Sequence, residues 1–316
     1  MSLFITIGGV SFAVLSMVAI FIGLSLHILR RGIHLEAETG LEKVIGKIVD
    51  YLCIILAIAI VSIMKIVFWI IEREWWFKGP MRRFFPLLIA KSGLKVIYSG
   101  EIYTTEELVA LIENVYKKAD ESSDHLHISI TPCMCRHATN NWSDDMPNLT
   151  CLHFNTVARP YHKALPQSLM ITADTAIDLV KEYASKWPFV HIIYGFCPSS
   201  PEYFDKQESI CFCHHHCAVI RTELKWGKYG IHPIKPANHL AIINGDNCKN
   251  CGTCHRKCPF FAIEKREINY EIIHERCYGC GVCKRFCPND AITLIERPNP
   301  KEHFIKREVL SLKHIQ

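Results

Sequence analysis

The stretch CKNCGTCHRKCP at 248–259 decides the fold of the C-terminal part of this chain. The same spacing returns as CYGCGVCKRFCP at 277–288, so that every cysteine and the trailing proline are displaced by 29 residues. Two Cys-x2-Cys-x2-Cys-x3-Cys-Pro runs at a fixed displacement do not arise by chance. They indicate a repeated metal-binding unit.

An iron-sulfur cubane needs four thiolates, and the two-residue spacings let one loop supply three of them while a distant cysteine supplies the fourth. We therefore predict that each fourth ligand comes from the other run. The predicted first [4Fe-4S] cluster is held by Cys248, Cys251, Cys254 and Cys287. The predicted second cluster is held by Cys277, Cys280, Cys283 and Cys258. Zinc is the alternative occupant, but zinc sites rarely repeat four-cysteine runs with a trailing proline.

Apolar segments flank both runs and are expected to form strands that exclude water: 240–243, 262–263, 268–273 and 291–295. The continuations CPFFAI at 258–263 and CPNDAI at 287–292 complete a pattern that resembles the bacterial two-cluster ferredoxins over about 50 residues. The resemblance implies two [4Fe-4S] clusters and one-electron transfer at low potential.

Seven further cysteines lie upstream: Cys133, Cys135, Cys151, Cys197, Cys211, Cys213 and Cys217. Two cysteines separated by one residue serve neighbouring irons of a cluster more easily than one tetrahedral ion. The candidate ligands of a third iron-sulfur cluster are Cys133, Cys135, Cys151, Cys211, Cys213 and Cys217. Zinc held by the last three with one histidine of 214–216 is the rival interpretation. Free buried cysteines are the remaining one.

The settings PCMCRH at 132–137, CLHF at 151–154 and CFCHHHC at 211–217 resemble a group of iron-sulfur proteins from anaerobic prokaryotes. In that group a Pro-Cys-x-Cys-Arg element, a Cys-Leu element and a cysteine-dense run precede a two-cluster ferredoxin domain. The histidines at 214–216 depart from the group's pattern. The resemblance implies no particular activity.

Two apolar runs near the N-terminus have the length of membrane spans. Residues 3–29 carry no formal charge, and residues 51–71 contain only Lys65. We predict a two-helix transmembrane hairpin within 1–78, and a signal peptide is the alternative. The protein is then expected in the cell membrane as a two-span protein. Its soluble domains are expected on the cytoplasmic side, because thiolates that bind iron need a reducing compartment.

The predicted fold class is α+β, with a central cysteine-rich α/β domain at 84–238, a ferredoxin domain at 239–297 and a basic tail at 298–316. Helix-capping residues and apolar periodicity predict helices at about 105–120 and 173–186. Alternating, β-branched segments predict strands at 126–130 and 189–194.

The composition gives a formal charge of only +5 for 316 residues, without a basic and aromatic groove, so nucleic acid is not an expected partner. Nucleotide-binding glycine motifs and a nucleophile elbow are also lacking.

We expect a membrane-anchored electron-transfer protein whose redox partners are a ferredoxin, a flavoprotein or a quinone-reactive subunit. A reductase with a substrate-binding metal site in the central domain is the alternative, and a structural or redox-sensing protein is the third. Catalytic residues are not identifiable from the sequence.

Overall fold

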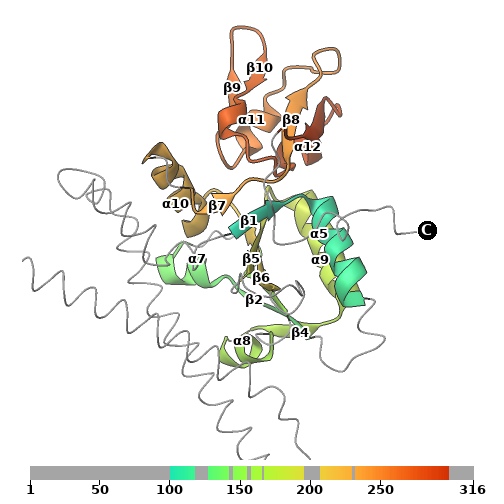
Figure 1. Ribbon diagram of the computed structural model, residues 1–316, viewed down its shortest axis with the longest axis vertical. Helices are drawn as coiled ribbons and strands as arrows, with labels where there is room; N and C mark the ends of the chain where they lie inside the picture. The colour runs from blue at the N-terminus through green and yellow to red at the C-terminus, as the bar shows by residue number, and fades with distance from the viewer. Residues whose placement is uncertain are drawn as a thin grey trace, which may run out of the picture. The chain divides into compact units, whose positions relative to one another are not determined.

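A computed structural model describes residues 100–117, 127–141, 145–154, 158–165, 167–195, 207–229 and 232–298 (Figure 1). The described chain contains an α+β mixture with one large sheet, followed by a small C-terminal region of short strands and helices.

Within the described ranges, the large sheet has seven strands in the order β4-β2-β3-β6-β5-β1-β7. Their bounds are β1 Gly100–Tyr103, β2 Ile128–Pro132, β3 Leu149–Phe154, β4 Leu169–Ile171, β5 Val190–Gly195, β6 Gln207–Cys213 and β7 Ile234–Lys235. Every neighbouring pair is antiparallel except β1 and β7, which are parallel. The strand order interleaves segments far apart in sequence, so the sheet gathers cysteines from distant motifs.

The described helices that accompany this sheet are α5 Thr105–Leu111, α7 Met134–Thr139, α8 Ala158–Ala164, α9 Ala173–Lys186 and α10 Ala218–Trp226. Helix α5 continues as a π-helical segment over Ile112–Lys117. Thr104 caps α5 in a capping box: its hydroxyl accepts from the Glu107 amide at 3.2 Å, and the Glu107 carboxylate accepts from the Thr104 amide at 2.8 Å. Thr172 caps α9 by accepting from the Thr175 amide. Both helices begin where the sequence predicts.

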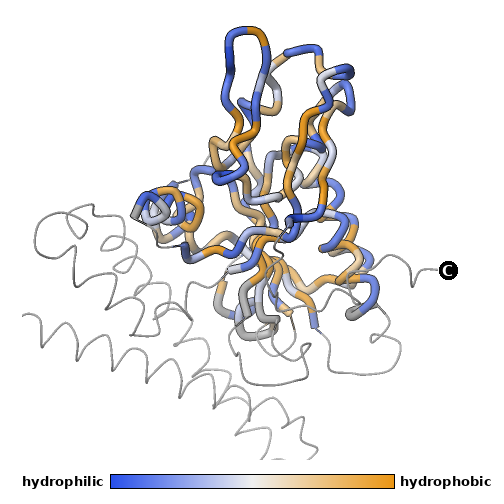
Figure 2. The backbone as a smooth tube through the Cα atoms, turned by 45° about the horizontal axis from the view of Figure 1, so that its top comes forward, coloured by the Kyte–Doolittle hydropathy of each residue, from blue (hydrophilic) through white to orange (hydrophobic). Residues whose placement is uncertain are grey.

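The two faces of the sheet bury different side chains, because successive residues of a strand point to opposite sides. On one face, Ile210, Phe212 and Ile193 pack with α5 and α9 in an aromatic and aliphatic core. On the other face, Val190, Ile192 and Cys213 join a second core with α10. Figure 2 shows that the strands of this sheet are largely hydrophobic. Both faces of the sheet thus contribute to a buried core.

The C-terminal region repeats one unit: strand, short helix, strand. The first half is β8 His239–Ile243, α11 Thr253–Lys257 and β9 Ile263–Lys265, and the second is β10 Tyr270–Ile272, α12 Val282–Arg285 and β11 Ile292–Glu296, with a 3-10 turn at His274–Arg276. Each two-stranded sheet takes one strand from each half, since β8 pairs with β11 and β9 pairs with β10. The Ile272–Ile263 pair corresponds to the Ile243–Ile292 pair after a shift of 29 residues. The register is thus the same in both sheets.

The second core of the large sheet extends into the C-terminal region. Phe260, Cys280 and Val282 belong to the same buried cluster as Cys213 and α10. The Ala237 amide donates to the Tyr278 carbonyl at 2.9 Å, and the Tyr278 hydroxyl donates to the buried carboxylate of Glu223. The two parts are held together by an apolar core with polar contacts at its edge.

The structure corrects the predicted fold class and location. Within the described residues, no helix combines the length and the apolar character needed to cross a bilayer. The expected spans at 3–29 and 51–71 lie outside those residues, as does the basic tail predicted at 298–316 apart from its first residue. The predictions of a two-helix transmembrane hairpin and of a two-span location in the cell membrane are corrected on the finding that the described residues contain no such helix. The fold class is an α+β mixture built on a large sheet.

Candidate iron-sulfur sites

One cysteine-lined cavity, which we call site 1, lies between the loop after β8 and the loop after α12. It contains about 330 Å³ of atom-free space, part of which is open to solvent, and it is lined by Cys248, Cys251, Cys254 and Cys287. Cys251 is exposed and the other three cysteines are half-buried. Gly252, Tyr270 and Pro288 complete much of the wall.

A second cavity, site 2, contains about 350 Å³ of atom-free space, part of which is open to solvent, and it is lined by Cys258, Cys277, Cys280 and Cys283. Cys280 and Cys283 are buried, and the rest of the wall is mainly apolar, with Ala241, Phe260 and Val282. In both cavities three cysteines come from one run and the fourth comes from the other. The structure thus brings together the two sets that the sequence predicts, while their binding of iron stays a prediction.

The backbone around both sites follows the same pattern. Three residues in each half have positive φ: Asn250, Gly252 and Phe261 in the first, and Gly279, Gly281 and Asp290 in the second. These turns fold the chain around the cysteines. As a result, the Ala262 amide donates to Cys258 Sγ and the Ala291 amide donates to Cys287 Sγ, both at 3.3 Å. Amide donors to sulfur stabilise thiolate charge, which suits a cluster ligand.

The electrostatics of the thiols also fit a metal cluster. Burial raises the pKa of Cys280 to about 12, and burial likewise raises the pKa of Cys254 and Cys258. The exposed Cys251 differs, because the Thr253 hydroxyl, 3.4 Å from its sulfur, lowers its pKa. Four thiolates in such cavities need a positive core to offset their charge, and an iron-sulfur core provides one. When bound, the cluster supplies one-electron chemistry.

Sequence reasoning missed Gly279, which stands just before Cys280. Its φ is +67°, and a Cβ at this position would lie 2.1 Å from the His239 carbonyl oxygen. Asn250 occupies the corresponding place in the first half with φ of 54°. Asn and Gly are the residues that adopt the left-handed backbone conformation most readily. Their equivalent positions in the two runs could therefore have predicted this conformation from the sequence.

The structure also brings the upstream cysteines together, on the face of the large sheet shared with α10. They come from the start of α7, from β3, from β6 and from the start of α10: Cys133, Cys135, Cys151, Cys211, Cys213 and Cys217. We call this group the thiol pocket. Hydrogen bonding from neighbouring thiols lowers the pKa of Cys133, and the same interactions raise the pKa of Cys135 and Cys151. Cys197 lies outside the described residues.

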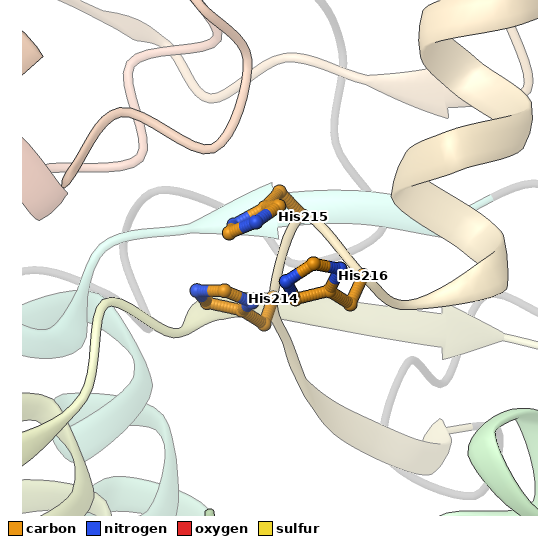
Figure 3. Close-up of side chains that lie close together, drawn as sticks. All are labelled: His214, His215 and His216. Atoms are coloured by element: carbon orange, nitrogen blue, oxygen red, sulfur yellow. The ribbon is translucent and has the colours of Figure 1, made fainter. Parts of the chain in front are cut away.

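The three histidines between Cys213 and Cys217 lie close together on the turn after β6 (Figure 3). One ring nitrogen from each of His214, His215 and His216 lies within 4.8 Å of the other two. His214 is buried and its Nδ1 has no hydrogen-bond partner among the described residues, whereas His216 is exposed. Burial lowers the pKa of His214 to about 3, which keeps its imidazole neutral. This is the histidine best suited to the predicted zinc alternative.

Comparison with known proteins bears on the C-terminal region alone. No curated protein and no solved structure matches the chain. Residues 241–294 match a family described as the 4Fe-4S dicluster domain, and this range contains all eight cysteines of sites 1 and 2. The chain therefore carries, near its C-terminus, an iron-sulfur domain of the 4Fe-4S dicluster kind.

Proposed function

We propose that this protein is a one-electron carrier that holds two [4Fe-4S] clusters, one in site 1 and one in site 2. The observation that carries the proposal is the pair of cavities, each lined by four cysteines contributed three to one by the two halves. An iron-sulfur domain suggests electron transfer in itself. The apolar cores around both cavities support it, because exclusion of water protects reduced clusters and tunes their potentials.

The two sites differ in exposure, which gives the proposed carrier a direction. Site 1 includes the exposed Cys251, whereas site 2 includes the buried Cys280 and Cys283. Site 2 also borders the core of the large sheet. We assign site 1 to exchange with an external redox partner and site 2 to exchange with the interior of the molecule.

Basic side chains stand at the rim of site 1, which supports a partner with an acidic surface. Lys249 lines the cavity and is exposed, and Arg256 is exposed and donates to the Cys251 carbonyl at 3.1 Å. Complementary charge steers redox proteins into contact and raises their association rate. An acidic ferredoxin or a flavoprotein has this chemistry, and either is a proposed donor.

The test is metal analysis and a redox titration of the anaerobically purified full chain. We would compare wild type with Cys254→Ala in site 1 and Cys283→Ala in site 2. Each variant should lose about four irons and one of two reduced-state EPR signals, since a [4Fe-4S] cluster holds four irons. The signal kept by each variant also shows that the domain still folds.

The titration should show reversible one-electron steps between about −700 and +450 mV, the range of such clusters. Retention of full iron by both variants would reject the assigned ligand sets. Absence of reversible reduction in iron-loaded protein would reject the carrier function.

A further inference from the structure

We infer that the thiol pocket is a third metal centre and that it holds an iron-sulfur cluster. Residues 241–294, the region matched by the iron-sulfur family, do not include it. The inference concerns a separate centre, so it goes beyond the proposed carrier function.

The first argument is convergence. Cys151 and Cys211 are direct register partners on β3 and β6, and their sulfurs are 3.7 Å apart. The Cys133 thiol interacts with those of Cys135, Cys151 and Cys217, and Cys213 links Cys211 to Cys217. The six thiols therefore form one continuous group, although they are spread over 85 residues of sequence. None of the described cysteines is in a disulfide.

The second argument is the placement of two of these cysteines at helix starts. Cys133 precedes α7 and Cys217 precedes α10, and neither side chain makes a capping hydrogen bond. Ser, Thr, Asp and Asn are strongly preferred at this position because their oxygen accepts from a free backbone amide. Here both thiols interact with other thiols instead of with backbone amides, which points to a role as metal ligands.

The third argument is charge. Arg136 is 4% exposed, and among the described residues its guanidinium donates to the carbonyls of Pro147 at 3.4 Å and Phe212 at 3.5 Å. It also lies over the Phe189 ring at 5.5 Å. No carboxylate within the described ranges forms an ion pair with it. An unpaired buried cation is costly, and a thiolate-ligated cluster beside Cys133 and Cys135 supplies the missing negative charge.

The spacing of the thiols favours a cluster over zinc. The pocket contains two Cys-x-Cys pairs, Cys133 with Cys135 and Cys211 with Cys213. Two cysteines separated by one residue serve neighbouring irons of a cluster more easily than they serve one tetrahedral zinc ion. In addition, Cys213 and Cys217 share one buried core with Cys280 of site 2. A redox centre in the pocket would thus be separated from site 2 by apolar protein interior rather than by water.

The experiment is quantification of iron, acid-labile sulfide and zinc in the anaerobically purified full chain, with reduced-state EPR. The pocket variant carries Cys133→Ala with Cys217→Ala. The matched control is Val190→Ala, which removes buried volume from the same core without removing a thiol. Cys283→Ala reports on site 2 independently.

We expect about 12 irons in wild type, the content of three [4Fe-4S] clusters, and about 8 in the pocket variant. The pocket variant should keep the EPR signals of sites 1 and 2, which shows that loss of iron is local. Val190→Ala should keep all the iron. Cys283→Ala should keep the pocket's share while losing that of site 2.

Three results would overturn the inference. One is about 8 irons in wild type with no change in the pocket variant. Another is a single zinc that is lost in the pocket variant. The last is a Cys151–Cys211 disulfide, detected by mass spectrometry of the unreduced protein, in place of any metal. If the protein lacked the iron of sites 1 and 2, the carrier function would be rejected instead. Any iron that remained and was lost in the pocket variant would then belong to the thiol pocket.

Discussion

At the residue scale, two glycines of the second half have the same unusual backbone but very different surroundings. Gly279 has φ of +67° and Gly281 has φ of +76°. A Cβ on Gly279 would overlap the His239 backbone, at 2.1 Å from its oxygen and 2.8 Å from its carbonyl carbon. A Cβ on Gly281 would only touch Leu294 Cδ1 at 3.4 Å. The pair separates the effect of a left-handed backbone from that of a steric overlap.

We predict that Gly279→Ala displaces Cys280 and empties site 2, whereas Gly281→Ala keeps its iron. The left-handed conformation alone costs about 1–2 kcal/mol for alanine, and both variants pay it. Only Gly279→Ala must also move the backbone of β8. Iron per chain and the thermal midpoint of each variant measure the difference, and equal iron in the two variants would contradict the steric explanation.

At the scale of elements, one side chain of α12 joins the iron-sulfur domain to the large sheet. The Arg285 guanidinium donates to the carbonyls of Ala184 at 3.3 Å and Phe189 at 2.6 Å, which lie at the end of α9 and just before β5. It also donates to the Cys280 carbonyl at 3.4 Å. The half-buried guanidinium thus connects α12, site 2 and the aromatic core.

Arg285→Ala is expected to lower the free energy of unfolding by about 3 kcal/mol, because hydrogen bonds to charged groups contribute about 1.5–3 kcal/mol and buried carbonyls are left unpaired. Arg285→Lys should recover part of this, since an ammonium reaches fewer carbonyls than the planar guanidinium. Denaturant unfolding measures both, with the exposed neighbour Lys284→Ala as control. A loss as small as that of Lys284→Ala would show that the contact does not anchor the domain.

Local signals predicted the elements much better than their assembly. Thr104 and Thr172 cap α5 and α9 as predicted, because capping depends on residues three positions apart. The repeat at 248–288 likewise predicted which cysteines meet in each cavity. Strand order depends on contacts between distant residues, so the pairing of Cys151 with Cys211 could not be read from the sequence. The membrane hairpin was predicted from the length and low charge of two apolar runs, and it is corrected above.

At the scale of the whole molecule, burial of one histidine links stability to pH. His191 is fully buried in β5, its Nε2 lies 3.0 Å from the Thr105 hydroxyl, and its Nδ1 has no hydrogen-bond partner. Burial, with a smaller effect of the Arg285 cation, holds its pKa well below the usual value. The folded protein therefore keeps this imidazole neutral.

As pH falls below about 6.5, the unfolded chain takes up a proton at this histidine that the folded chain does not. The contribution of neutral His191 to the free energy of unfolding is therefore fully present above that pH. Below it, this contribution decreases by up to about 1.4 kcal/mol per pH unit. We predict that His191→Gln flattens the profile of unfolding free energy between about pH 6.5 and 5, relative to wild type. The exposed His274→Gln should not change the slope, and a wild-type slope in His191→Gln would exclude this residue as the cause.

The exchange of strands between the two halves has a consequence for the origin of the iron-sulfur domain. Each half gives one strand to each small sheet, and each cavity borrows one cysteine from the other half. A single unit of about 29 residues would thus have two open strand edges and an incomplete ligand set. It could satisfy both only by pairing with a second copy of itself, as a symmetric homodimer. The domain has the architecture of such a dimer fused into one chain by duplication.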